Sequence, residues 1–191
     1  MATGLTDIKT LRARARQDIE SGAVTPSYGA DRDKVVQLLN EALATEMVCV
    51  LRYKRHYFMA KGLASQSVAQ EFLEHAQEEE QHADMIAERI VQLGGEPDFS
   101  PIGLAERSHA EYVTGDSLVD MIREDLVAER IAIDSYREMI RFVGDRDSTT
   151  RRLLEQIQAT EEEHAEDLVS FIEEMERWPE RFPGREPGAQ A

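Results

Sequence analysis

The sequence predicts an all-α protein built as a four-helix bundle, and three observations support this prediction. Residues that enter helices at little cost, chiefly Glu, Ala, Leu, Arg, Gln and Ile, dominate from about residue 31 to residue 178. Four stretches of this region repeat apolar residues at steps of three and four, the period of a helix with one buried face. Glycines and prolines separate the stretches, and signals for β-strands are absent.

The first two helices are expected at about residues 32–61 and 67–93. Gly62 lies near the end of the first, and a Gly94-Gly95-x-Pro97 sequence stops the second. Their predicted inward-facing residues are Leu39, Ala42, Leu43, Val50, Tyr53 and Tyr57 in the first helix and Phe72, Ala76, Ile86 and Ile90 in the second.

The third helix is expected at about residues 118–143, with Asp116 or Ser117 as its cap, and the fourth from Asp147 or Ser148 to about residue 178. Their predicted inward-facing residues are Leu118, Ile122, Leu126, Ile133, Tyr136 and Ile140 in the third helix and Leu154, Ile157, Leu168, Phe171 and Ile172 in the fourth.

A long connection, residues 98–114, joins the second helix to the third. A connection of this length is a crossover that lets these two helices run parallel, and residues 102–113 can form a short helix within it. Beyond residue 178 the sequence PERFPGREPGAQA cannot continue as a helix, so we expect no fifth helix. We therefore divide the chain into an N-terminal extension (1–30), the bundle (31–178) and a flexible C-terminal tail (179–191).

Composition narrows the class of protein. A chain of 191 residues can bury one core without disulfides. It has a single cysteine, Cys49, which rules out an intramolecular disulfide and a metal site built from several cysteines of this chain. We expect Cys49 to be a small core residue. The net charge of −16 attracts cations and disfavours nucleic acid, although acidity also serves solubility. No apolar run resembles a secretory or membrane segment, so we expect a soluble, cytoplasmic protein.

Charged residues occupy positions where the helical pattern calls for apolar ones. Glu46 lies on the apolar stripe of the first helix, and Glu79 and His82 lie one turn apart on that of the second. The third and fourth helices repeat this arrangement with Glu129 and then Glu161 and His164. The corresponding spacings are 33 and 32 residues, and a tyrosine follows the first glutamate of each half by seven residues, as Tyr53 and Tyr136.

A metal centre explains this internal repeat. Four carboxylates converging in a low-dielectric core repel one another and need cations or protons. Two divalent ions would balance four carboxylates, and ligation by oxygen with one nitrogen per ion suits iron or manganese. A single Glu-x-x-His is more often a solvated helix face than a ligand pair, but two such pairs, each with an inward glutamate on the preceding helix, form the full di-metal pattern. The other histidines, His56, His75 and His109, are expected to be surface or packing residues.

The segments LNEALATEM, EEEQHADMIAERIVQLGGEP, DLVAERIAI and TEEEHAEDLVSFIE resemble the ferritin-like superfamily, specifically bacterioferritins, over about residues 35–172. The resemblance implies that Glu46 and His82 are terminal ligands of one iron and that Glu129 and His164 are terminal ligands of the other. It implies that Glu79 and Glu161 bridge the two irons. It also places Tyr53 beside the centre, where it can hydrogen-bond the ligands, supply an electron, or simply pack.

The chain departs from bacterioferritins at two places. The family's haem-binding methionine is replaced by Glu80, which disfavours haem, and the helix that its 24-subunit shell uses after the fourth helix is missing. A longer crossover and an N-terminal extension resemble Dps-like mini-ferritins of twelve subunits, although those place iron between subunits. We therefore expect a hollow homo-oligomer, twelve subunits in size, with a bacterioferritin-type centre.

The function that follows is iron storage and detoxification by a ferroxidase that oxidises Fe(II) to Fe(III), with O2 or H2O2 as electron acceptor. One alternative is another di-metal redox enzyme, such as a peroxidase or a manganese catalase. A second is a DNA-protecting protein, suggested by Lys9, Arg12, Arg14 and Arg16. Because these four basic residues belong to an acidic chain and more often form one solvated helix face, we disfavour DNA as a partner.

Overall fold

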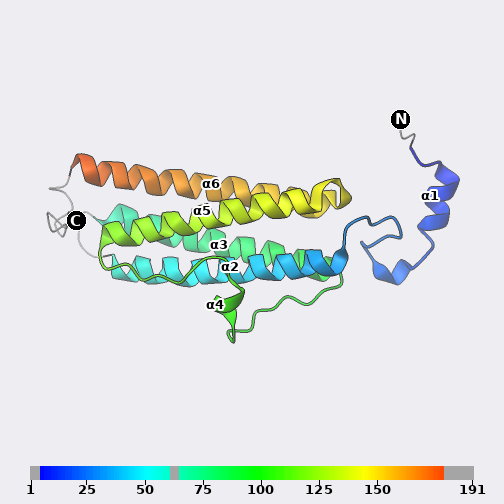
Figure 1. Cartoon of the computed structure of the whole chain (residues 1–191), viewed down its shortest axis with the longest axis horizontal. Helices are drawn as coiled ribbons and strands as arrows, with labels where there is room; N and C mark the ends of the chain where they lie inside the picture. Colours follow the sequence, from blue (N-terminus) through cyan, green and yellow to red (C-terminus); the bar gives the residue numbers. More distant parts are fainter. Residues whose placement is uncertain (1–4, 61–64, 179–191) are drawn as a thin grey trace.

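A computed structural model describes residues 5–60 and 65–178 and shows an all-α four-helix bundle with no strand among these residues (Figure 1). The bundle helices are α2 (Arg32–Met59), α3 (Gln66–Gln92), α5 (Leu118–Val143) and α6 (Ser148–Arg177). Helix α2 packs mainly against α3, and α5 packs mainly against α6. The predicted fold class is confirmed.

The observed helix starts follow the predicted caps. The side chain of Ser117 accepts a hydrogen bond from the amide of Asp120 at the start of α5, and Asp147 does the same for Thr150 at the start of α6. Helix α2 ends at Met59, whereas the predicted end at residue 61 and Gly62 lie outside the described residues. The predicted C-terminal tail and the missing fifth helix also lie outside them.

The long connection between α3 and α5 is a crossover, as predicted, and α3 and α5 consequently run in the same direction (Figure 1). It contains only one short helix, α4 (Leu104–Arg107), which is much shorter than the segment considered from sequence. The crossover runs along α2, where the Asn40 side chain accepts from the amide of Asp98 at 2.7 Å and Thr45 Oγ1 accepts from the amide of His109 at 2.9 Å. Polar residues of α2 thus fix the path of the chain.

The buried face of α5 differs from the predicted one. Ile122, Glu129 and Tyr136 are buried as predicted, but Leu118, Leu126, Ile133 and Ile140 are only partly buried. The remaining buried positions of the helix were not predicted: Met121, Asp125, Ala128, Ala132, Met139 and Val143. The prediction relied on large apolar residues, whereas small alanines and one aspartate occupy the centre of the buried face. The predicted face is therefore turned partly away from the observed one. Asp125 is consequently buried, at a position that the apolar pattern did not predict.

The N-terminal segment begins with α1 (Ile8–Arg14) and a short 3-10 turn, η1 (Ile19–Ser21), which lie beyond one end of the bundle (Figure 1). Another 3-10 turn, η3 (Gly144–Arg146), links α5 to α6. The segment returns to the bundle through Tyr28, whose hydroxyl donates to Asp147 at 2.8 Å. Among the described residues, no helix is long and apolar enough to cross a membrane.

Candidate metal centre

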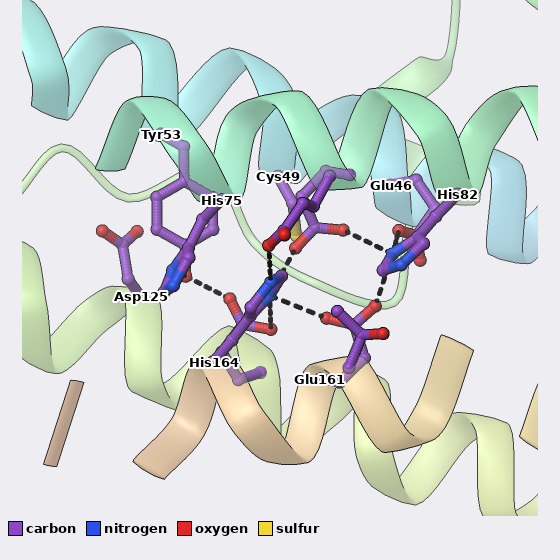
Figure 2. Close-up of polar contacts among 12 residues, drawn as sticks. Glu46, Cys49, Tyr53, His75, His82, Asp125, Glu161 and His164 are labelled. Carbon is purple, nitrogen blue, oxygen red and sulfur yellow. Dashed lines mark hydrogen bonds and ion pairs between the residues drawn. The ribbon is translucent and has the colours of Figure 1, made fainter. Parts of the chain in front are cut away.

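The structure brings the six predicted ligand residues together inside the bundle, between α2, α3, α5 and α6, and Figure 2 labels four of them: Glu46, His82, Glu161 and His164. Each helix contributes the residues that the repeat assigned to it. All six are buried, with His82 the most exposed at 5%: Glu46, Glu79, His82, Glu129, Glu161 and His164. Residues at intervals of three on a helix share a face, so each Glu-x-x-His pair points into the same space.

His82 marks one end of the centre. Its Nδ1 lies 2.9 Å from Oε1 of Glu161, 3.3 Å from Oε2 of Glu46 and 3.6 Å from Oε2 of Glu79. These four residues each offer one atom to a group in which all atoms lie within 4.8 Å of one another. A single cation at this position would be surrounded by three carboxylates and one imidazole.

His164 marks the other end. Its Nδ1 lies 3.4 Å from Oε2 of Glu161, 3.7 Å from Oε1 of Glu79 and 3.9 Å from Oε2 of Glu129. These residues form a second group of four within the same 4.8 Å limit. Glu79 and Glu161 belong to both groups, whereas Glu46 with His82 and Glu129 with His164 each belong to only one of the two.

Unsatisfied atoms test whether these residues fit metal ions. Each of the six has at least one buried side-chain oxygen or nitrogen without a hydrogen-bond partner: Glu46 Oε2, Glu79 Oε1, His82 Nδ1, Glu129 Oε2, both oxygens of Glu161 and His164 Nδ1. A buried polar atom without a partner costs about 1–3 kcal/mol. A cation between the helices would coordinate these atoms together, so the donor set fits metal.

The pKa values of the ligand residues also indicate that the centre needs positive charge. Burial, reinforced by the charge of Glu79, raises the pKa of Glu46 to about 8, and burial with the charges of Glu79 and Glu161 raises the pKa of Glu129 as well. Burial alone would lower the pKa of His164, but the carboxylates of Glu161 and Glu79 outweigh it and raise that pKa to about 12. The metal-free centre therefore holds protons in place of cations, and binding metal must release them.

Two tyrosines cross between the halves of the site. The hydroxyl of Tyr53, on α2, donates to Oε1 of Glu129 on α5, and the hydroxyl of Tyr136, on α5, donates to Oε1 of Glu46 on α2. Both rings are buried. Each hydroxyl leaves the other oxygen of its carboxylate facing the cluster, so the tyrosines orient the two unshared glutamates.

A second buried polar cluster lies beside Tyr53, and the sequence analysis missed it. Asp125 accepts from Arg52 Nε at 2.8 Å and is bonded to His56 Nδ1 at 2.7 Å. Arg52 also donates to the carbonyl of Glu111, and His56 Nε2 lies 3.1 Å from the carbonyl of Thr114. His56 is thus a bonded core residue that ties the crossover to α2 and α5.

His75 is also more than a packing residue. It is 2% exposed, and its ring stacks on His164 with centroids 3.9 Å apart (Figure 2). Its Nδ1 lies 3.2 Å from the hydroxyl of Tyr53. The available signal was its position one turn before Glu79 on the same helix, the same argument that identified His82. Cys49, by contrast, is buried as expected.

The ligand residues have partners outside the cluster as well. Nε2 of His164 lies 2.7 Å from Oε2 of Glu78, a half-exposed residue of α3. If His164 binds metal through Nδ1, Nε2 carries the proton and donates to this carboxylate, which fixes the orientation of the ring. Glu80, at the position discussed for haem, is exposed and lies 3.6 Å from Lys54 Nζ.

Fold and site together define a four-helix-bundle protein with a buried carboxylate–histidine centre. A family model described as a ferritin-like domain matches residues 36–178. The chain belongs to this ferritin-like family, and its relatives lie among bacterioferritins and Dps-like proteins. The stated resemblance is confirmed.

Individual relatives cover most of the chain. The bacterioferritin of Mycobacterium avium is 29% identical over 145 residues, which span 75% of this chain and 87% of the relative. A nutrient stress-induced DNA-binding protein of Synechococcus is 30% identical over 145 residues, spanning 73% and 81%. Among solved structures, a dodecameric thioferritin described as the bacterioferritin-related protein of Bacteroides fragilis matches with a TM-score of 0.76 and 32% identity, covering 81% of this chain and 94% of that one.

Proposed function

We propose that the protein stores and detoxifies iron by oxidising Fe(II) to Fe(III) at a di-iron ferroxidase centre. The observation that carries this proposal is the pair of overlapping four-residue groups, because they share Glu79 and Glu161. Two cation positions with two common carboxylates define a bridged pair. Iron storage is the function that the bacterioferritin relatives support.

The two groups support a proposed role for each ligand. Glu46 and His82 are the terminal ligands of one iron, Glu129 and His164 are those of the other, and Glu79 and Glu161 bridge. Four carboxylates balance the charge of two Fe(II) ions. All-oxygen and imidazole ligation also accepts manganese, so the metal is settled by loading experiments.

The reaction is a two-electron transfer. Each Fe(II) loses one electron, and O2 with two protons becomes H2O2, or H2O2 with two protons has its O–O bond broken and becomes two waters. The positive charge in the site rises by two as both irons reach Fe(III). The carboxylates supply the negative charge that this step requires, and the product Fe(III) leaves as storage mineral.

Tyr53 is the residue to which we assign an auxiliary role. Its hydroxyl holds Glu129 in place, and its ring lies in contact with the centre rather than in the surrounding apolar core alone. It can orient the ligand or supply an electron to the irons. Tyr136 makes the equivalent bond to Glu46 and shares the orienting role.

Glu129→Ala tests the centre. Removing this ligand should slow the initial rate of Fe(II) oxidation in stopped-flow absorbance by about 100-fold or more, since loss of even outer-shell partners costs 10- to 100-fold. Glu138→Ala removes an exposed carboxylate from the same helix and should leave the rate unchanged. Oxidation by Glu129→Ala at the wild-type rate, with a helical circular dichroism spectrum, would refute the assignment.

We propose a hollow homododecamer as the assembly. The Bacteroides fragilis protein that the chain resembles is dodecameric, and exposed apolar residues in the N-terminal segment, Leu5, Ile8 and Ile19, suit contacts between subunits. Mass photometry should find a particle of about 260 kDa, twelve times the 21.7 kDa chain. A stable dimer would remove the storage cavity, and a particle twice as heavy would indicate a 24-subunit shell.

One alternative has an observation in its favour. The Synechococcus relative is named a DNA-binding protein, and Lys9, Arg12, Arg14 and Arg16 lie in or beside the exposed helix α1. Binding through these residues should weaken steeply with salt and vanish when all four are replaced by Ala. A band shift that persists in that variant would exclude this segment as the cause.

A further inference from the structure

Two hydrogen bonds in series, through the hydroxyl of Tyr53, link His75 to Glu129 of the centre. As a ligand, Glu129 is a carboxylate and can only accept, so the Tyr53 hydroxyl gives its proton to Glu129. The oxygen of Tyr53 must then accept from Nδ1 of His75, 3.2 Å away. A neutral imidazole carries one proton, so Nε2 of His75 is left with a lone pair.

That lone pair faces two carboxylates. Nε2 of His75 lies 3.4 Å from Oε1 of Glu71, on α3, and 3.9 Å from Oδ2 of Asp167, on α6. His75 is only 2% exposed, so this nitrogen is shielded from water, and it has no hydrogen-bond partner in the protein. Three electron-pair donors converge with no proton donor between them, and a cation is what would satisfy all three.

The internal repeat shows that this arrangement is not imposed by the fold. When Glu79 is matched with Glu161, Glu71 corresponds to Leu153 and His75 corresponds to Ile157. By the same matching, Asp167 corresponds to Met85. Ile157 is fully buried, and Leu153 and Met85 pack against the same apolar cluster. A bundle of this kind can therefore close that position with apolar side chains, and only one half of the chain carries ligands there.

We propose that Glu71, His75 and Asp167 form a third divalent-cation site, which receives Fe(II) from solvent and passes it to the di-iron centre. This role rests on the proposed ferroxidase function. The side chains of Glu71 and Asp167 are 26% and 53% exposed, so an ion reaches them from water. One imidazole and two carboxylates suit Fe(II), and water can complete the coordination.

The position of His75 explains how such a site would be coupled to the centre. His75 belongs both to the outer group with Glu71 and Asp167 and to an inner group with Glu129 and His164. Nε2 faces the outer group, Nδ1 lies 3.2 Å from the Tyr53 hydroxyl that holds Glu129, and the ring stacks on His164. An ion held by His75 is thus separated from the ligands of the second iron by a single imidazole.

Cobalt(II) binding tests the third site separately from oxidation. Full-length protein is dialysed to equilibrium against Co(II) without oxygen, and bound cobalt is counted per subunit; crystals soaked in Co(II) then locate each ion by anomalous scattering. The test variant is Glu71→Gln/Asp167→Asn, which changes side chains that reach solvent. The matched control is Glu74→Gln/Glu166→Gln, because these exposed carboxylates are on the same two helices and the charge change is identical.

We expect three Co(II) ions per subunit in the wild type and the control, and two in the test variant, whose third ion should bind at least about 10-fold more weakly. An anomalous peak between Glu71, His75 and Asp167 supports the site whatever the di-iron centre does. Absence of that peak in the wild type, or an equal cobalt count in the test variant, overturns the third site. Absence of the two central peaks overturns the ferroxidase proposal instead, so the two failures are distinguishable.

Discussion

The two halves of the chain contribute matching ligands to one centre but surround them differently. Glu46 on α2 and Glu129 on α5 are equivalent, as are the Glu-x-x-His pairs of α3 and α6. The neighbours are not equivalent. Four residues before Glu129 is Asp125, whereas four before Glu46 is Ala42; four before Glu79 is His75, whereas four before Glu161 is Ile157.

The surroundings of the two tyrosines, Tyr136 and Tyr53, differ in polarity. Around Tyr136 the core is apolar and includes Leu39, Ile157 and Met139. Around Tyr53 it holds the buried charges of Arg52 and Asp125 together with His56 and His75. The ligand set must be symmetric to bridge two ions, but its surroundings need not be. The proposed third cation site, with His75, belongs to the polar surroundings of Tyr53.

The crossover explains part of this asymmetry. In the part of the chain that the structure describes, the long connection between α3 and α5 runs along the bundle, and its carbonyls need partners where it passes. Arg52 and His56 provide these partners at Glu111 and Thr114, and Asp125 holds both side chains in place. Their counterparts by position in the second half are Ser135 and Met139, and Met139 packs in the apolar core.

Adding metal should produce the largest change in stability and should treat the two halves alike. Fe(II) without oxygen, free at about a thousand times its dissociation constant, stabilises the folded state by about 4 kcal/mol for each ion bound. The melting temperature should therefore rise well above that of chelator-treated protein. Glu46→Ala and Glu129→Ala should each lose a similar part of this rise. An unchanged melting temperature in the wild type would count against the centre.

Replacing Asp125 should show the asymmetry most directly. Asp125→Ala leaves the buried guanidinium of Arg52 without its charge partner, and breaking a buried ion pair costs about 3–5 kcal/mol. Denaturant unfolding measures this loss. Asp134→Ala is the control on the same helix, since Asp134 pairs with Arg137 at the surface and should cost less than about 1 kcal/mol. Equal losses in the two variants would show that the polar cluster is not required for stability.

Sequence reasoning found the fold and the convergent ligand residues because both depend on periodicity. Glu46, Glu79 and His82 interrupt a regular apolar stripe, and the second half repeats the interruption. Their role as ligands remains a proposal. Helix bounds were also predictable, since Ser117 and Asp147 carry capping side chains.

The polar end could not be found in the same way. Asp125 lies on a face of α5 lined with alanines, and a search for large apolar residues assigns that face elsewhere. The partners of Arg52 and His56 are backbone carbonyls of the crossover, which carry no signature in the sequence. His75 lies one helical turn before Glu79, on the same face as the ligand pair, but it lacks a counterpart in the second half, where Ile157 stands. An argument from repetition therefore excluded it.

The two tyrosines provide a finer comparison. Tyr53→Phe and Tyr136→Phe each remove a hydrogen bond to a buried glutamate, at a cost of about 2 kcal/mol. Tyr53→Phe also removes the acceptor for Nδ1 of His75, so it should cost about 1 kcal/mol more. Denaturant unfolding of metal-loaded protein, in which Glu129 is a carboxylate, separates the two values. Equal costs would mean that His75 does not donate to Tyr53.

The smallest expected effect concerns the start of α6, where Tyr28 of the N-terminal segment contacts Asp147. Tyr28 donates to Asp147, but this carboxylate also accepts two bonds from Arg89 and caps α6 through Thr150. Tyr28→Phe therefore removes one of several partners and should cost only about 1 kcal/mol, or about 2–4 °C in melting temperature. Asp147→Ala removes the shared acceptor and leaves the buried guanidinium of Arg89 without its charge partner, so it should cost clearly more. If Tyr28→Phe were as damaging as Asp147→Ala, the N-terminal segment would be an integral part of the bundle rather than an extension held at one point.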